Sequence, residues 1–189
     1  MRQNPARRTA LLDAAIEVLA REGSRGLTLR ALDTEAGVPT GTASNYFTNR
    51  ADMLGQIMQR TRERLTPDAS DVAETLKAEP THELVKTFMH QIIERMRADR
   101  SSHLAMLELR LMATRNPELH AELTRFFRDE LEGNINFHLD SGLPGDTTGM
   151  VLLYLAMFGL MVDDLTIPEL LAPHQPERLV DEMVSRLLL

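Results

Sequence analysis

The sequence predicts an all-α protein, from the spacing of its apolar residues and from its composition. Apolar residues recur every three or four positions through most of the chain, which is the pattern of a helix with one buried face. Aromatic residues make up only 4% of the sequence and Trp is absent, so Leu, Ala and Met, all good helix formers, supply most of the core. No part of residues 1–66 alternates with a period of two, so no strand competes there. About nine helices are expected in all.

The first helix is expected to begin at Asn4-Pro5, a capping residue followed by the proline that suits a first helical turn. Gly23 is placed to end this helix. Thr28 should cap a second helix that ends at Gly37, and a short third helix is expected over residues 40–47. A short helix, a tight glycine turn and a second short helix, held against a supporting helix, are typical of a helix-turn-helix.

A fourth helix is expected to follow Asn49, with Asp52 as the reciprocal acid of a capping box, and to stop before Pro67. The predicted domains are therefore a helix-turn-helix head over residues 1–50, a linking helix over 50–66 and a helical second domain over 67–189. The clearest break in that second domain is the turn-forming cluster at 141–146. Its helices are expected over residues 81–97, 101–114, 117–139 and 147–165, with a last one after Pro176.

Charge is distributed unevenly along the chain. The net charge is −7, yet residues 1–65 hold ten Arg, no Lys and seven acidic residues, a balance of +3, which leaves −10 on the rest. A basic front on an acidic body favours a DNA-reading head on a body that does not bind DNA. Chance variation in composition is the alternative, since +3 is modest.

The chain has no Cys, which removes disulfides, thiolate metal sites and cysteine nucleophiles together. This composition fits a reducing cytoplasm, and no signal-peptide pattern is visible at the N-terminus. The longest apolar run, residues 150–162, has 13 residues and is too short to span a bilayer. We therefore expect a cytoplasmic protein without a membrane partner.

Residues 8–55 resemble the DNA-binding region of the TetR family of transcriptional regulators. The stretches that carry the resemblance are Leu27–Leu32, Glu35–Val38, Gly41-Thr42, Asn45–Phe47, Asn49-Arg50 and Asp52–Leu54. The chain departs from the common family pattern at Pro39, where Ser is frequent, and at Ala43 and Ser44, which replace a common Leu and Tyr. These departures leave open which bases are read.

The resemblance implies a DNA-binding surface built from the recognition segment, which is the short helix expected over residues 40–47, and from the residues on either side of it. Its expected members are Thr28, Thr40, Gly41, Thr42, Ser44, Asn45, Tyr46 and Arg50. Asn45 has the chemistry to pair with adenine, and Thr42 to touch a thymine methyl.

Phosphate contacts are expected from Tyr46, Arg50 and the helix start at Thr28. Each of these residues also has a purely structural interpretation. Thr28 is a helix cap in any case, Tyr46 could pack in the core, and Arg50 could be a solvated charge. If Ala43 and Phe47 face the core, Tyr46 is expected to point outward.

Specific sites normally need two helix-turn-helix heads on a palindrome, so a homodimer is expected. By resemblance, it pairs through the helices near 118–140 and 147–165. The second of these is apolar nearly all round, which also fits a central core helix.

The resemblance also implies a pocket for an apolar or amphipathic effector among the middle helices. The candidate lining residues are Phe88, Met89, Ile92, Met96, Leu107, Glu108, Leu111, Phe126, Tyr154 and Phe158. Each Met or Phe could equally be ordinary core packing. His90 and Glu94 are spaced to share a helical face, but two ligands do not make a metal site, and no metal or cofactor is expected.

The function predicted from these features is a DNA-binding regulator, most simply a repressor that a small molecule releases from palindromic double-stranded operator DNA. A helical enzyme is the main alternative, but no spacing brings a Ser, a His and an acid together, so no catalytic residue is assigned. A helical interaction or scaffold protein is a third interpretation. Operator binding in a gel shift would separate these three classes.

Overall fold

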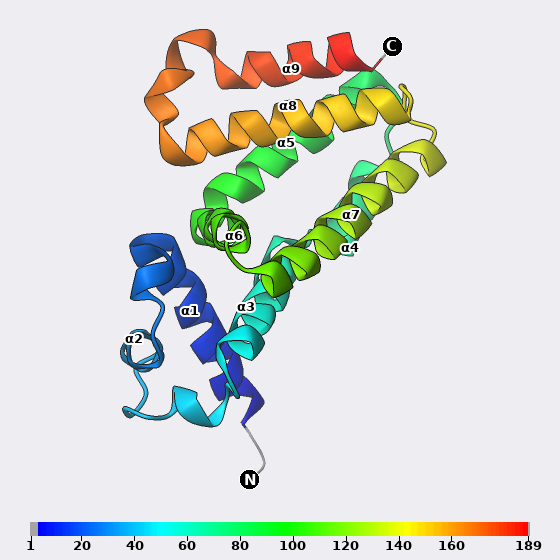
Figure 1. Ribbon diagram of the computed structural model, residues 1–189. Helices are drawn as coiled ribbons and strands as arrows, with labels where there is room; N and C mark the ends of the chain where they lie inside the picture. Colours follow the sequence, from blue (N-terminus) through cyan, green and yellow to red (C-terminus); the bar gives the residue numbers. More distant parts are fainter. Residues whose placement is uncertain (1–3, 189) are drawn as a thin grey trace. The chain divides into compact units, whose positions relative to one another are not determined.

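The computed structural model describes residues 4–188 and is all-α, as the sequence predicts. No strand occurs in that range (Figure 1). The α-helices are α1 (Pro5–Gly26), α2 (Leu29–Glu35), α3 (Arg50–Leu65), α4 (Ala69–Thr75), α5 (His82–Ala98), α6 (Arg100–Ala113), α7 (Pro117–Asp140), α8 (Thr147–Thr166) and α9 (Pro176–Leu187). Three short 3-10 helices complete the structure: η1 (Ala43–Asn45), η2 (Pro168–Leu170) and η3 (Ala172–His174).

The chain divides into two compact units. The first contains the residues up to Thr66 together with Asp99–Phe126, and the second contains Pro67–Ala98 together with the chain from Phe127 onward. The helices α6 and the first part of α7 therefore group with the N-terminal helices, although they lie in the second half of the sequence.

In the first unit, α1 packs against α2, α3 and α6. Its buried face carries the apolar positions that the sequence places at helical spacing. Leu11, Ala15, Ile16 and Leu19 have no exposed side-chain surface. Helix α3 also packs on α6, so α1, α3 and α6 share one core that supports α2.

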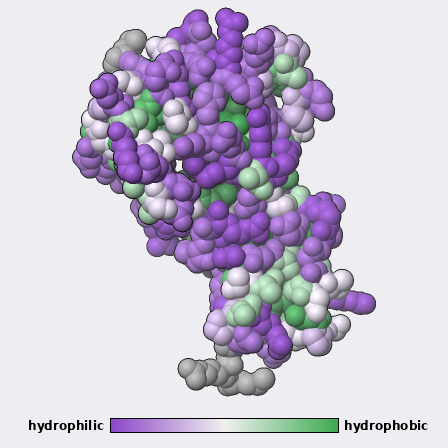
Figure 2. All heavy atoms as spheres, turned by 180° about the vertical axis from the view of Figure 1, so that it is seen from behind, coloured by the Kyte–Doolittle hydropathy of each residue, from purple (hydrophilic) through white to green (hydrophobic). Residues whose placement is uncertain are grey.

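In the second unit, α9 packs on α5 and α8, and α8 also contacts α5 (Figure 1). Val180 and Val184 of α9 are buried there. Buried His138, near the end of α7, hydrogen-bonds through Nε2 to the carbonyl oxygen of Pro144 at 2.8 Å. This bond fixes the turn at residues 141–146 that leads into α8. The face drawn in Figure 2 is mostly hydrophilic, with its apolar surface in separate patches.

The helix ends follow the capping residues that the sequence offers. The Asn4 side chain accepts from the backbone N–H groups of Ala6 and Arg7, and Pro5 occupies the first turn. Gly23 marks a kink rather than an end. Its φ of 66° breaks the helical path, and helical structure continues to Gly26.

Helix α8 is longer than the 13-residue apolar run that it contains. Over its 20 residues it is apolar and long enough to cross a membrane by length and composition alone, with 33% of its most apolar window buried. The core helix of a soluble protein passes the same test. Helix α8 packs on α5 and α9.

Candidate nucleic-acid interface

Helix α2 is held at its start by Thr28. The Thr28 hydroxyl accepts from the backbone N–H of Ala31 at 3.2 Å, as expected for an N-cap, and the residue itself is exposed. Leu32 anchors the opposite face of α2, because its side chain is fully buried. This short helix therefore has a fixed inner face and a solvent-exposed start.

The turn after α2 depends on glycine. Gly37 has a φ of 64° and Gly41 a φ of 90°, a backbone region that residues with a side chain rarely adopt. The N–H of Gly37 bonds to the carbonyl of Thr34, and the N–H of Val38 bonds to the carbonyl of Asp33. These bonds close α2 and redirect the chain toward residue 40.

The recognition segment differs from the expected helix over residues 40–47. Only Ala43–Asn45 form a regular turn, the 3-10 helix η1, with a bond from Tyr46 N–H to the Ala43 carbonyl at 2.9 Å. The N–H of Phe47 also reaches the Ala43 carbonyl, at 3.3 Å. The segment is thus one tightened helical turn, framed by Gly41 before it and α3 after it.

The inner face of this turn contains more residues than expected. Ala43 and Phe47 are buried, as the sequence predicts. The prediction that Tyr46 points outward is wrong, since the residue is only 8% exposed. Tyr46 and Phe47 follow η1 and are not part of a helix, so helical spacing does not set the directions of their rings. The Arg8 guanidinium lies 6.0 Å from the centre of the Tyr46 ring.

The remaining candidates form a small polar surface. Thr40, Gly41, Ser44 and Asn45 are exposed, and Thr42 is half-buried. The Ser44 hydroxyl donates to the Gly41 carbonyl at 2.7 Å, and the Thr42 hydroxyl donates to the Pro39 carbonyl at 2.5 Å. Because these hydroxyl protons are used within the turn, the oxygens are left to act as acceptors toward a ligand.

Arg50, at the start of α3, is exposed but tied to the backbone. Its guanidinium donates to the carbonyl of Leu27 at 3.3 Å and to that of Ser24 at 3.2 Å. Arg50 therefore joins the start of α3 to the chain that follows the α1 kink. A guanidinium has five donors, so these two bonds still leave capacity for a phosphate.

The cap of α3 closely matches the expected capping box. The Asn49 side chain accepts from the Asp52 N–H at 2.8 Å. The Asp52 carboxylate accepts from the Thr48 N–H at 2.7 Å, whereas a capping box would use the N–H of the next residue, Asn49. The Thr48 N–H, with a further hydrogen bond from the Gln56 side chain, holds the pKa of Asp52 below its usual value.

Asp33 is the residue of this region that the sequence analysis did not single out. It is 2% exposed, and its two carboxylate oxygens accept from the backbone N–H groups of Gly41 and Ala43, at 2.6 and 2.7 Å. One signal was available in the sequence. Pro39 has no side chain that could cap the turn. The helix before it carries an acid, Asp33, two positions after Ala31.

The candidate effector-pocket residues fall in both compact units. Leu107, Glu108, Leu111 and Phe126 belong to the first unit, and the α5 and α8 candidates belong to the second. Met96 is fully buried, whereas Leu111 is 60% exposed. Within the second unit, the Phe88 ring meets Phe137 edge-on at 5.8 Å, and Tyr154 and Phe158 stack at 6.3 Å.

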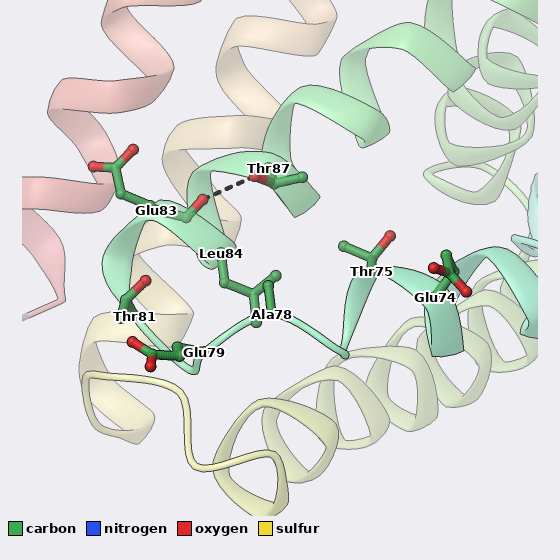
Figure 3. Close-up of a pocket in the computed structure, with 8 residues that line it drawn as sticks. All are labelled: Glu74, Thr75, Ala78, Glu79, Thr81, Glu83, Leu84 and Thr87. Atoms are coloured by element: carbon green, nitrogen blue, oxygen red, sulfur yellow. Dashed lines mark hydrogen bonds between the residues drawn. The ribbon is translucent and has the colours of Figure 1, made fainter.

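A hollow of about 350 Å³ lies elsewhere in the second unit, between α4, α5 and their connection (Figure 3). Its lining is Glu74, Thr75, Ala78, Glu79, Thr81, Glu83, Leu84 and Thr87. None of the candidate effector residues contributes to it. The effector pocket stays a prediction.

His90, which is spaced to share a helical face with Glu94, has a carboxylate partner on another helix. His90 Nε2 lies 2.8 Å from the Asp181 carboxylate of α9. Within residues 4–188, no group of three or more His, Asp or Glu side chains is arranged to hold a metal ion. His90 therefore connects α5 to α9 in this structure.

This arrangement defines the class of protein: a helix-turn-helix regulator whose N-terminal helices are followed by a helical body. The family description "Bacterial regulatory proteins, tetR family" matches residues 11–57. A second description, "Tetracyclin repressor-like, C-terminal domain", matches residues 80–189, more than half of the chain. The chain therefore belongs to the TetR family of bacterial transcriptional regulators.

Individual relatives agree with this assignment. The nicotine-responsive transcriptional repressor HdnoR of Paenarthrobacter nicotinovorans is 29% identical over 133 residues, covering 69% of this chain and 66% of that repressor. The match thus spans just under two thirds of that relative's length. The multidrug binding protein EbrR, solved with ethidium, is 26% identical with a TM-score of 0.68, covering 98% of this chain and 99% of EbrR. A transcriptional regulator from Rhodococcus sp. RHA1 shares the fold, with a TM-score of 0.71, 19% identity and coverage of 96% and 95%.

Proposed function

We propose that this protein is a repressor that binds palindromic double-stranded operator DNA as a homodimer and leaves it when a small molecule binds. The observation that carries the proposal is the polar surface formed by Thr40, Gly41, Ser44 and Asn45, presented on one tight turn beside an exposed helix start. Small polar side chains on a turn of this size fit a major groove and meet base edges there.

Three residues around this surface are proposed to contact the phosphate backbone. Arg50 supplies a positive charge, and the start of α2 at Thr28 presents backbone N–H groups. Tyr46 keeps a phosphate role only through its hydroxyl, because its ring is packed. The uneven charge of the chain supports the proposal, since ten Arg lie in residues 1–65 of a protein with net charge −7.

The proposed dimer uses α7 and α8, the helices expected from the sequence. Within the second unit, α8 exposes Leu152 (46%) and Leu155 (57%), and Gly159 follows on the same face at helical spacing. Phe137 and Leu139 near the end of α7 are also exposed. Exposed apolar side chains of this size are typical of a surface that another chain covers.

The proposed effector is an apolar or amphipathic small molecule. Support comes from the aromatic and Met residues of α5 and α8 and from EbrR, a similar multidrug binding protein solved with ethidium. Effector binding would favour a spacing of the two heads that does not match successive major grooves. We assign no catalytic residue and propose that the protein acts in the cytoplasm.

The test begins with selection of duplexes from a random-sequence library by the purified protein. We expect enrichment of a palindrome, with binding that is much tighter than to random DNA and that weakens steeply with salt. Failure to enrich any sequence at low salt would contradict the proposed function. Apolar and amphipathic compounds that raise the melting temperature are then tested for release of the selected duplex, because coupling between two sites is reciprocal.

A further inference from the structure

The recognition turn provides no side-chain cap of its own. Thr42, the residue before η1, makes no capping bond, because its hydroxyl donates backward to the Pro39 carbonyl. Pro39 has no side-chain acceptor. The N–H groups of Gly41 and Ala43 lie at the start of the turn, where no preceding helical turn supplies carbonyl acceptors.

Asp33 of α2 supplies both partners. Its Oδ2 accepts from Gly41 N at 2.6 Å and its Oδ1 from Ala43 N at 2.7 Å. The carboxylate is 2% exposed, so water does not compete for these bonds. Hydrogen bonds from backbone N–H to an ionised carboxylate are short and stronger than neutral ones. Here two such bonds join Asp33 to residues eight and ten positions further along the chain.

We propose that Asp33 is the positioning residue of the DNA-reading turn: its carboxylate substitutes for the cap that Pro39 cannot provide and fixes η1 on α2. This inference rests on the proposed function, because it takes the surface from Thr40 to Asn45 as the reader of DNA. A binding surface works only when its side chains are held within about 0.5 Å of the productive geometry, and two bonds from one carboxylate hold the start of the turn.

The chemistry requires a carboxylate rather than an amide. Asn in place of Asp33 has nearly the same shape but only one acceptor oxygen, and its NH₂ group would face a backbone N–H. One turn amide therefore loses its partner. The charge change alone acts in the opposite direction, because removing a negative charge beside DNA favours binding.

The experiment compares Asp33→Asn with Glu35→Gln. Glu35 lies on the same helix and its substitution changes the charge by the same amount, but it pairs with Arg21 on the surface at 2.8 Å instead of contacting the turn. Affinities are measured for the palindrome selected by the wild-type protein and for a random duplex. We expect Asp33→Asn to weaken binding to the palindrome by about tenfold or more while binding to random DNA is unchanged or tighter. Glu35→Gln should weaken neither.

A rescue variant separates positioning from general destabilisation. Pro39 lies two residues before Gly41, and its carbonyl accepts from Thr42 N at 3.1 Å. A Ser there has an oxygen that can accept from Gly41 N. Asp33→Asn combined with Pro39→Ser should recover most of the affinity for the palindrome. If Asp33→Asn alone does not fold, the combined variant should fold, and its failure to fold would overturn the inference.

Hydrogen exchange supplies a measurement that does not depend on DNA. In Asp33→Asn, the amides of Gly41 and Ala43 should exchange faster while those in the middle of α1 keep the wild-type rate. Unchanged exchange at both amides would overturn the role of Asp33. The role would also be overturned if Asp33→Asn bound the palindrome as tightly as Glu35→Gln does. If the wild-type protein selects no duplex, the proposed function fails, and the exchange result alone still decides whether Asp33 anchors the turn.

Discussion

Arg50 illustrates how one side chain serves both the fold and the proposed interface. Its guanidinium donates to the Leu27 and Ser24 carbonyls, just after the α1 kink. The same group is exposed at the start of α3, beside the recognition turn. A rigidly held cation reaches a phosphate with less loss of side-chain freedom than a mobile one, so the two roles support each other.

Substitution of Arg50 by Ala should weaken binding to the selected palindrome and to random DNA by a similar factor, because a phosphate contact carries no sequence information. The slope of log affinity against log salt should flatten by about one unit, since one fewer counterion is released. Salt titrations of both duplexes measure this change.

The control for Arg50 is Arg186→Ala, an exposed arginine of α9 that pairs with Glu182 at 2.7 Å. It removes the same charge from the second unit and should leave the salt slope as in the wild-type protein. An unchanged slope in Arg50→Ala would exclude a phosphate contact at this position and leave Arg50 with its structural role alone.

At this scale, sequence reasoning identified helix caps better than side-chain directions. Asn4, Thr28 and Asn49 cap helices as predicted, because a cap depends on a few neighbouring residues. The orientation of Tyr46 was predicted incorrectly because the regular turn ends at Asn45, so helical spacing does not apply to Tyr46. Asp33 was missed because its partners lie eight and ten residues away, a separation that helical periodicity does not report.

At the scale of elements, a charged cluster joins three helices of the first unit. Arg64 of α3 pairs with Asp99 at 2.7 Å and with Glu17 of α1 at 3.4 Å. Asp99 also caps α6, since it accepts from the Ser102 N–H at 3.2 Å and from the Ser102 hydroxyl at 2.7 Å. Burial alone would raise the pKa of Asp99, but the hydrogen bonds from Arg64 and Ser102 hold it below its usual value.

This lowered pKa predicts an acid-sensitive junction between α3 and α6. A carboxyl whose pKa is lower in the folded than in the unfolded protein stabilises the fold fully above the unfolded value, near 3.9, and loses that contribution as the pH falls through the folded value. Asp99→Asn should therefore be less stable than the wild-type protein at pH 7. The difference should narrow below about pH 4, as urea unfolding across the pH range would measure.

The matched control is Asp140→Asn, at the exposed end of α7 in the second unit. It removes one carboxylate without touching the α3–α6 junction, so its unfolding curve should follow that of the wild-type protein. A stability difference for Asp99→Asn that stays constant from pH 7 to about pH 3 would show that ionisation of Asp99 contributes nothing to the junction.

Element prediction succeeded where an apolar stripe was present and failed where it was not. The helices with buried faces, such as α5 and α6, lie within a few residues of the expected ranges. Helix α4 was not expected, and it has no buried residue. The grouping of α6 with the N-terminal helices could not be read from the sequence, because it arises from contacts between residues far apart in the chain, such as Ser101 of α6 with Glu17 of α1, 84 positions apart.

At the scale of the whole molecule, the two units carry different surfaces. The chain up to Thr66 contains ten of the nineteen arginines and the polar recognition turn, whereas the second unit contains the exposed leucines of α8. A single turn contacts few base pairs, so affinity for an operator depends on a second copy of the chain. Under the proposed function, affinity for the operator therefore depends on the α8 surface that joins the two copies, although no residue of α8 is proposed to touch DNA.

Substitution of Leu155 by Glu tests this dependence. Leu155 is 57% exposed and lies on the same α8 face as Leu152. In a two-fold symmetric interface the same surface meets itself, so one substitution introduces two carboxylates into an apolar contact and removes two leucines. Burial of each leucine contributes about 1.5–3 kcal/mol, so the dimer should weaken by a hundredfold or more. Light scattering should find a monomer at concentrations where the wild-type protein is a dimer.

The same variant should bind the palindrome only as tightly as a duplex with one half-site, because each head then binds alone. Leu170→Glu provides the control: this leucine is 55% exposed in η2, outside α7 and α8, and its substitution should leave both the dimer and operator binding intact. A dimeric Leu155→Glu with wild-type affinity would rule out this face of α8. A monomeric Leu155→Glu that still binds the full palindrome at wild-type affinity would instead show that the heads pair on DNA without the α8 contact.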